Sequence, residues 1–264
     1  MKVAGLQTVS ATKVEDNLEQ ARSLIEQAAR RGAKLMVLPE YFCLMGRKDA
    51  EKLDIAEEPG KGPIQSFLSA QARQHGVYII GGTLPMRSDD PTKVYNSSLV
   101  FGPDGQQIER YDKIHLFQFK TEQESYDEGK ILKAGSIPKV VTCGDIRVGL
   151  STCYDLRFPE LYRALGKVDL IVVPSAFTYT TGKAHWELLL RARAVENQCY
   201  VLGSAQGGRH ENGRRTWGHS MIVDPWGDVL ACHEDGLGVV VSELNPDRID
   251  QIRTSLPALT HRVI

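Results

Sequence analysis

The segment that most constrains the fold of this chain is residues 168–173, with the sequence Val-Asp-Leu-Ile-Val-Val. Its side chains are mostly apolar and β-branched, and they do not alternate with polar ones. A run of this kind is typical of a strand that is buried on both faces, because neither face is suited to solvent. Strands of this type belong to layered α/β folds, so the segment predicts such a fold.

Strand-like and helix-like segments alternate along the rest of the chain. The patterns predict helices at residues 14–31, 63–75, 158 or 159 to 165, and 183–197, and a last helix from Asn245-Pro246. They predict strands at residues 2–8, 35–38, 77–80, 94–101, 107–111, 140–142, 146–151, 200–204, 218–223, 229–232 and 239–244. No linker or repeat is visible, so we expect one domain over residues 1–264 with two sheets.

The composition is that of a folded domain and argues against several classes of protein. The 264 residues are 42% hydrophobic and 25% charged, which suffices for a substantial core and argues against disorder. A formal net charge of −1 gives no overall attraction for nucleic acid or for an anionic membrane. No signal-peptide pattern and no apolar run near the ~20 residues that cross a bilayer is visible. The five scattered cysteines suggest reduced thiols, so we expect a cytoplasmic protein without nucleic-acid or membrane partners.

Three chemically active residues each lie just beyond a predicted strand: Glu40, Lys113 and Cys153. Functional side chains in α/β sheets gather in such loops, and a cysteine in a polar, exposed loop is a candidate nucleophile. Each residue alone also fits an ordinary role. Glu40 fits a surface carboxylate or a helix cap, Lys113 fits an ion pair with Asp112, and Cys153 fits an unreactive thiol. Spacing alone favours these ordinary roles.

The motifs around these three residues resemble the signature blocks of the nitrilase superfamily of carbon–nitrogen hydrolases. The blocks are Leu38-Pro39-Glu40, Tyr111-Asp112-Lys113-Ile114-His115-Leu116-Phe117 and Cys153-Tyr154-Asp155-Leu156-Arg157-Phe158-Pro159-Glu160. Further similarity runs through residues 174–177, 181–187, 191–198, 218–220 and 223–227. The resemblance covers essentially the whole chain and implies a single-domain, four-layer α-β-β-α sandwich.

The resemblance also implies an amidase that uses a cysteine, a glutamate and a lysine. In this mechanism Glu40 takes the thiol proton while Cys153 attacks the amide carbon, and a thioester forms as the amine leaves. Glu40 then activates the water that releases the acid. Lys113 and the backbone N–H of Tyr154 would stabilise the negative oxygen of the tetrahedral intermediates.

The resemblance also predicts a second glutamate in residues 115–138, a segment without the regular hydrophobic periodicity of a helix or strand. Glu128 fits the family pattern best, with the role of orienting Lys113 and the substrate amide. Glu122 and Glu124 lie close enough in the sequence to compete with it. Neither a metal-ligand spacing nor a phosphate-binding glycine motif appears, so we expect neither a metal nor another cofactor.

Residues that bind the substrate follow from the same resemblance. In the branch of the superfamily that acts on ω-amides of α-keto acids, the matching positions are Arg157, Phe177 and Thr181. The guanidinium of Arg157 suits a carboxylate, although it could instead pair with Asp155 or Glu160. The substrate is therefore expected to be a small amide that carries a carboxylate or an α-keto acid group.

Two segments distinguish between substrates of that branch. Residues 198–201 and 205–210 are more similar to the amidases that act on deaminated glutathione than to those that act on α-ketoglutaramate. We therefore expect hydrolysis of deaminated glutathione to 2-oxoglutarate and cysteinylglycine. A basic loop at residues 209–215 could meet a larger peptide-like acid, or it could be merely solvated.

Alternative functions and the assembly remain as further expectations. An ω-amidase for α-ketoglutaramate or another small amide is the nearest alternative, and an inactive scaffold for protein interaction is a different one. The joint presence of Glu40, Lys113 and Cys153 argues against the scaffold. Because sandwiches of this family commonly pair through helices, we expect a homodimer with residues 183–197 and 158–165 as candidate interface helices.

Overall fold

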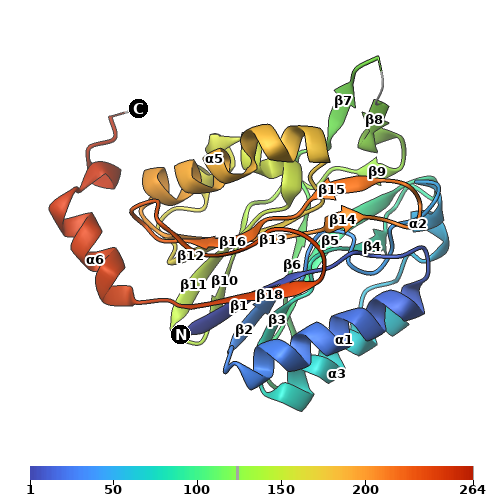
Figure 1. Ribbon diagram of the computed structural model, residues 1–264, viewed down its shortest axis with the longest axis horizontal. Helices are drawn as coiled ribbons and strands as arrows, with labels where there is room; N and C mark the ends of the chain where they lie inside the picture. Colours follow the sequence, from blue (N-terminus) through green and yellow to red (C-terminus); the bar gives the residue numbers. More distant parts are fainter. Residues whose placement is uncertain (123–124, 264) are drawn as a thin grey trace.

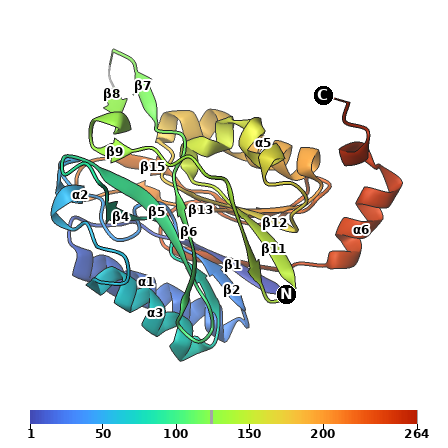
Figure 2. The ribbon, with the colours of Figure 1, turned by 180° about the vertical axis from the view of Figure 1, so that it is seen from behind.

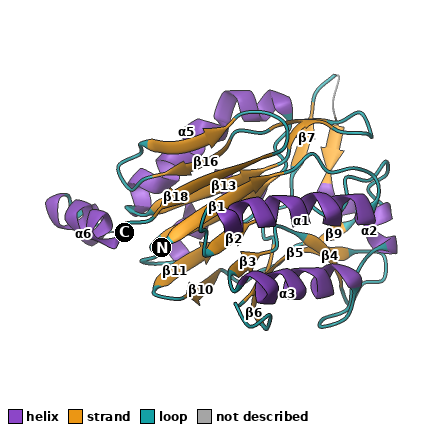
Figure 3. Ribbon diagram, turned by 60° about the horizontal axis from the view of Figure 1, so that its bottom comes forward, coloured by secondary structure: helices purple, strands orange, loops and turns teal. Residues whose placement is uncertain are grey.

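The chain forms four layers in a computed structural model that describes residues 1–122 and 125–263 (Figure 1). Two large β-sheets pack face to face. Helices α1 (Val14–Arg30) and α3 (Pro63–His75) cover the outer face of the first sheet, side by side (Figure 3). Helices α4 (Pro159–Ala164) and α5 (Tyr179–Asn197) cover the outer face of the second. The expected α-β-β-α sandwich is confirmed.

The first sheet follows the order β18-β1-β2-β3-β5-β4, and β6 and β9 also pair with β5. Its strands are β1 (Lys2–Gln7), β2 (Leu35–Val37), β3 (Tyr78–Ile80), β4 (Leu84–Arg87), β5 (Val94–Phe101), β6 (Gln107–Asp112), β9 (Leu132–Lys133) and β18 (Gly238–Glu243). Strands β1, β2 and β3 are parallel. Parallel neighbours leave the sheet at the same edge, so the segment after β2 and those from adjacent strands meet there.

The second sheet follows the order β10-β11-β12-β13-β16-β17. Its strands are β10 (Lys139–Cys143), β11 (Ile146–Leu150), β12 (Leu170–Ser175), β13 (Tyr200–Ala205), β16 (Ser220–Val223) and β17 (Val229–His233). Strands β11, β12 and β13 are parallel, so the loops after β11 and β12 lie next to each other. This sheet therefore supplies a second group of strand ends.

Strand β12 confirms the prediction from which the fold was inferred, because all six of its residues are buried. Leu170 and Val172 contribute to the core between the two sheets. Ile171 and Val173 contribute to the core beneath α5, together with Trp186 of that helix. Period-2 alternation thus sends successive apolar side chains into two different cores, which explains why the segment has no polar face.

Several elements differ from the predicted ones. Helix α5 begins at Tyr179 rather than at residue 183, because the hydroxyl of Thr178 accepts the N–H of Thr181 and caps the helix there. The irregular segment contains the hairpin β7 (Gln118–Lys120) and β8 (Ser125–Asp127), followed by the 3₁₀-helix η1 (Glu128–Lys130). Short elements such as these span too few residues to show a period.

The sequence did not predict α2 (Glu51–Asp54), β4, or the hairpin of β14 (Gly207–Arg209) and β15 (Arg215–Trp217). Two more 3₁₀-helices are η2 (Cys153–Arg157) and η3 (Ala258–Thr260). Helix α6 (Pro246–Ser255) begins at the proline of the predicted Asn245-Pro246 start and extends from one end of the sandwich (Figure 2). In the part of the chain that is described, no helix is long and apolar enough to cross a membrane.

Candidate functional site

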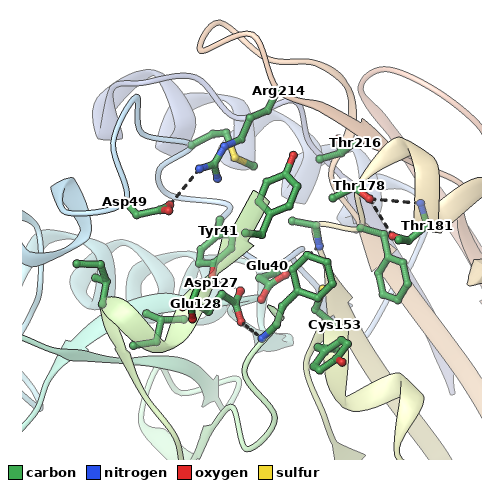
Figure 4. A pocket seen from close by; sticks show the side chains of 18 of the residues that line it. Glu40, Tyr41, Asp49, Asp127, Glu128, Cys153, Thr178, Thr181, Arg214 and Thr216 are labelled. Atoms are coloured by element: carbon green, nitrogen blue, oxygen red, sulfur yellow. Dashed lines mark hydrogen bonds and ion pairs between the residues drawn. The ribbon is translucent and has the colours of Figure 1, made fainter. Parts of the chain in front are cut away.

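The three strand-exit residues come together at one pocket. Glu40 follows β2, Lys113 follows β6 of the same sheet, and Cys153 follows β11 of the other sheet. Glu40, Cys153 and Glu128 line the pocket (Figure 4), and the Nζ of Lys113 contacts both glutamates. The pocket therefore lies where the exits of the two sheets meet, and it contains residues far apart in the sequence.

Cys153 occupies a strained turn. It is the first residue of η2 and has a φ of 49°, a left-handed conformation that is uncommon for a residue with a side chain. Only 8% of Cys153 is exposed. The sequence-based expectation of an exposed loop thiol is therefore wrong, because Cys153 belongs to the buried core cluster beneath α5. The side chain is nevertheless a lining residue of the pocket, so a bound molecule can reach it.

The carboxylate of Glu40 is held from several directions. Its Oε1 accepts hydrogen bonds from Lys113 Nζ at 2.8 Å and from Asn96 Nδ2 at 2.9 Å. Its Oε2 accepts the backbone N–H of Ala176 at 3.0 Å. The carboxylate also lies close enough to the thiol of Cys153 to raise the pKa of that thiol. A buried carboxylate with this many fixed donors has one orientation, and that orientation places it beside the thiol.

Glu128 is the second glutamate at the site. Both of its carboxylate oxygens accept from Lys113 Nζ, at 3.0 and 2.8 Å, and the hydroxyl of Tyr41 donates to Oε1 at 2.8 Å. Glu122 is exposed, and Glu124 lies outside the described residues. The geometry therefore brings Glu128, rather than Glu122, to Lys113.

The charges of the site modify one another. Burial raises the pKa of the Cys153 thiol well above its usual value, and the carboxylate of Glu40 raises it further. Burial also raises the pKa of Glu40, against the effect of Lys113 and with a further increase from Glu128. Burial opposes the ammonium of Lys113, but Glu128 and Glu40 hold its pKa well above the usual value. These shifts favour a neutral thiol and a charged ammonium in the resting site.

Asp155 joins the segment of Lys113 to the segment of Cys153. Its buried carboxylate accepts the hydroxyl of Tyr111 at 2.6 Å and the backbone N–H of His115 at 3.0 Å, and it lies 2.7 Å from the ring Nδ1 of His115. Tyr111 and His115 flank Lys113 by two residues on either side. The carboxylate therefore fixes how the lysine strand lies against the cysteine turn.

The predicted substrate-binding residues lie together on one side of the pocket. The guanidinium carbon of Arg157 lies 5.5 Å from the ring centre of Phe177 and 5.9 Å from that of Tyr154. Both Nη atoms of Arg157 lie 3.3 Å from Nδ1 of His185. The alternative pairing of Arg157 with Asp155 is wrong, because Tyr111 and His115 occupy that carboxylate.

Thr181 lines the pocket on the same side, and its hydroxyl lies 2.9 Å from that of Thr178 (Figure 4). Within the described residues, no group of three or more His, Cys, Asp or Glu side chains could hold a metal ion.

Sequence reasoning missed several residues of the site, among them Asn96, Tyr41 and Asp155. Asn96 gave a usable signal, because Asn96-Ser97-Ser98 places three polar residues inside an apolar strand, and all three are buried. A buried polar side chain needs a partner, and the partner of Asn96 is Glu40. Tyr41 and Asp155 gave no comparable signal, because their partners come from other parts of the chain.

Comparisons with known proteins fit this geometry. Residues 2–254 match the family described as carbon-nitrogen hydrolase. A protein of Synechocystis sp. named deaminated glutathione amidase is 42% identical over 266 residues, which covers 98% of this chain and 97% of that protein. The crystal structure of Saccharomyces cerevisiae Nit3, a member of branch 10 of the nitrilase superfamily, matches with a TM-score of 0.90 and 32% identity, over 100% of this chain and 97% of that one.

A more distant structure bears on the chemistry. It is a glutamate-to-glutamine mutant of the amidase from Nesterenkonia sp. AN1, and it matches with a TM-score of 0.77 and 26% identity, over 97% of this chain and 98% of that one. That structure is described as the result of Michael addition of acrylamide at the active-site cysteine.

Proposed function

Since this chain belongs to the carbon–nitrogen hydrolase family, we propose that it is an amidase that hydrolyses deaminated glutathione to 2-oxoglutarate and cysteinylglycine. The contacts of Lys113 with Glu40 and Glu128, beside the thiol of Cys153, are the observation that carries amide hydrolysis. The name of the Synechocystis relative, which is similar over nearly the full length of both chains, supports the substrate.

The reaction begins with a neutral thiol. As Sγ of Cys153 attacks the amide carbon, Glu40 takes the thiol proton and a C–S bond forms. The raised pKa of Glu40 makes its carboxylate a stronger base for this transfer. Glu40 then gives the proton to the amide nitrogen, the C–N bond breaks, and the amine leaves a thioester. Water attacks the thioester while Glu40 takes its proton, and the thiol regains that proton as the acid leaves.

Lys113 stabilises the negative oxygen that forms in both steps. An ammonium carries three N–H groups. One points to Glu40 and one can be shared by the two oxygens of Glu128, which leaves the third for the oxyanion. The backbone N–H of Tyr154 is the second donor in this proposal. Buried donors that are already oriented need little reorganisation as the charge develops.

Arg157, Phe177 and Thr181 are proposed to hold the acyl part of the substrate. Arg157 would bind the carboxylate of the α-keto acid, because its guanidinium lies against two rings and faces the pocket. The alternative substrate α-ketoglutaramate carries the same acyl group, so these residues do not distinguish the two substrates.

Side-by-side kinetics test the substrate. We expect kcat/KM for deaminated glutathione to exceed that for α-ketoglutaramate by at least about tenfold, measured as release of 2-oxoglutarate. Tenfold corresponds to about 1.4 kcal/mol of differential transition-state binding. Comparable kcat/KM values for the two substrates would remove the preference for deaminated glutathione. If neither substrate is turned over, the proposed function is contradicted.

The pH profile of kcat/KM should show the raised pKa of Glu40. Glu40 acts as a base only when ionised, so activity falls as the pH falls through its pKa, and that acid limb should lie above 4.5. Glu128 adds to the increase, so Glu128→Gln should move the limb to lower pH, even though the variant is slower overall. A limb that stays in place, or moves upward, would contradict this assignment.

We also propose that the protein forms a homodimer through α5 and α4. Leu188 and Val195 of α5 are 66% and 49% exposed, and Trp226, in the turn beside that helix, is 55% exposed. Arg191 Nε donates to the carbonyl of Gly227 at 2.8 Å, so this turn and α5 present one surface. An exposed cluster of large apolar residues favours burial against another protein. Light scattering that returns the mass of a monomer would contradict the dimer.

A further inference from the structure

The side of the pocket opposite Thr178 and Thr181 carries a second group of charges. Asp49, Lys52 and Arg214 all line the pocket, and Figure 4 places Asp49 and Arg214 opposite Thr178 and Thr181. Lys52 Nζ lies 2.8 Å from Asp49 Oδ1, and Arg214 Nη2 lies 3.1 Å from the same oxygen. We call these three residues the Asp49 cluster.

The cluster contains more positive than negative charge. One carboxylate neutralises one of the two cations, so the group retains a net charge of +1. Both cations also lie on aromatic rings, Lys52 Nζ at 4.8 Å from the ring centre of Tyr41 and the guanidinium carbon of Arg214 at 5.9 Å from that of Tyr126. Rings replace part of the water around these cations, which strengthens their attraction for an anion.

The loop that carries Arg214 is held in place. Asn212 Nδ2 donates to the carbonyls of Met45 and Gly46, at 3.1 and 2.7 Å. Arg47 pairs with Glu211 at 3.0 Å, which joins the same two loops a second time. A cation on an anchored loop loses little conformational entropy when it binds, so the cluster is preorganised for a ligand.

We propose that Lys52 and Arg214 bind a carboxylate on the leaving amine of the substrate. This inference rests on the proposed function and adds a subsite to it. The amide carbon has two substituents, and Arg157 and its neighbours take the acyl side. The amine side then faces the Asp49 cluster. Asp127, which also lines the pocket, lies beside Glu128 rather than beside Arg214 (Figure 4).

The length of the leaving group determines which amides can bind to this subsite. Two extended residues span roughly 7 Å, so cysteinylglycine carries its carboxylate well beyond the scissile nitrogen. Ammonia, the leaving group of α-ketoglutaramate, has no such reach and no negative charge. The subsite would therefore favour dipeptide-like amines that end in a carboxylate over free ammonia.

A comparison of two substrates isolates the carboxylate. Deaminated glutathione and its C-terminal glycinamide differ only in that group. We expect wild-type kcat/KM to be about 10–100-fold higher for the acid, as for a charge-assisted contact of ~1.5–3 kcal/mol. In Arg214→Gln and Lys52→Met, this acid-to-amide ratio should fall towards one.

Arg215→Gln is the matched control. Arg215 is the next residue and the first of β15, but its guanidinium carbon lies 3.6 Å from the ring centre of Tyr179 and it is not among the lining residues. This variant removes the same charge from the adjacent position and should keep the wild-type ratio. A change of the ratio in Arg215→Gln equal to that in Arg214→Gln would show a general charge effect and would overturn the subsite.

The remaining outcomes separate the subsite from the proposed function. If deaminated glutathione is hydrolysed and the ratio is near one, or stays high in Arg214→Gln and Lys52→Met, the subsite is wrong and the function stands. If deaminated glutathione is not hydrolysed, the function is wrong. The subsite is then measured as inhibition of α-ketoglutaramate or small-amide turnover by cysteinylglycine and by its amide. Equal inhibition, or no inhibition, would overturn it.

Discussion

Replacement of Cys153 by alanine is expected to lower kcat for amide hydrolysis by about 10⁴-fold or more. The variant lacks the sulfur that is proposed to form the thioester, and binding with oxyanion stabilisation alone leaves only a small residual rate. Release of 2-oxoglutarate measures the loss. In parallel, acid-quenched wild-type protein should gain the mass of the acyl group, and Cys153→Ala should not.

The chain supplies a control for this experiment. Cys232 lies on β17, is exposed, and is not among the pocket residues, so Cys232→Ala should keep the wild-type rate. Equal loss in both variants would indicate a general effect of removing a thiol. If Cys153→Ala keeps the wild-type rate, another group must be the nucleophile.

Replacement of Lys113 by methionine is expected to affect both stability and activity. The ammonium is fully buried between Glu40 and Glu128, so its loss leaves one buried and one partly buried carboxylate without a counter-charge. Removing one partner from a buried ion group typically costs ~3–5 kcal/mol of unfolding free energy. Loss of the oxyanion donor should lower kcat by roughly 10²–10³-fold as well. Chemical denaturation and steady-state kinetics measure the two effects separately.

A double variant separates these two consequences. Adding Glu128→Gln to Lys113→Met removes one unpaired charge, so the double variant should regain part of the stability but none of the activity. If the double variant is less stable than Lys113→Met, the charge argument is wrong.

The ion group of Lys113, Glu40 and Glu128 persists over a wide range of pH. Because the pKa of Lys113 is raised above 10.5, its contribution is complete below that pH and is lost only as the pH rises through the raised value.

The sequence predicted the layers of the fold because its long elements have clear periods. Helix α3 has the bounds that its pattern predicted, from Pro63 at its first position to His75, with Gly76 in a left-handed conformation after it. The hairpin of β5 and β6 also follows its pattern, with the predicted turn between them. Elements of two to four residues, such as β4 and β14, lack enough positions to repeat a pattern.

The reactive residues of the candidate site were predictable from the sequence, but their burial and their neighbours were less so. Glu40, Lys113 and Cys153 were found because motifs and strand exits mark them. The burial of Cys153 was not predicted, since its core cluster gathers residues from β12, β13 and α5, which are distant in the sequence. Arg214 shows the same limit. The sequence indicates only a basic loop, and the loops at residues 45–52 and 210–214 must fold together before Asp49 and Arg214 meet.

The neutral state of the resting thiol has a consequence for the lifetime of the enzyme. Peroxide oxidises the thiolate form of cysteine, and susceptibility also increases with exposure. Cys153 is 8% exposed, and burial together with Glu40 raises the pKa of its thiol, which favours the protonated form. If Cys153 is the nucleophile as proposed, its thiolate forms only within a turnover, and we expect the resting protein to resist oxidation by peroxide.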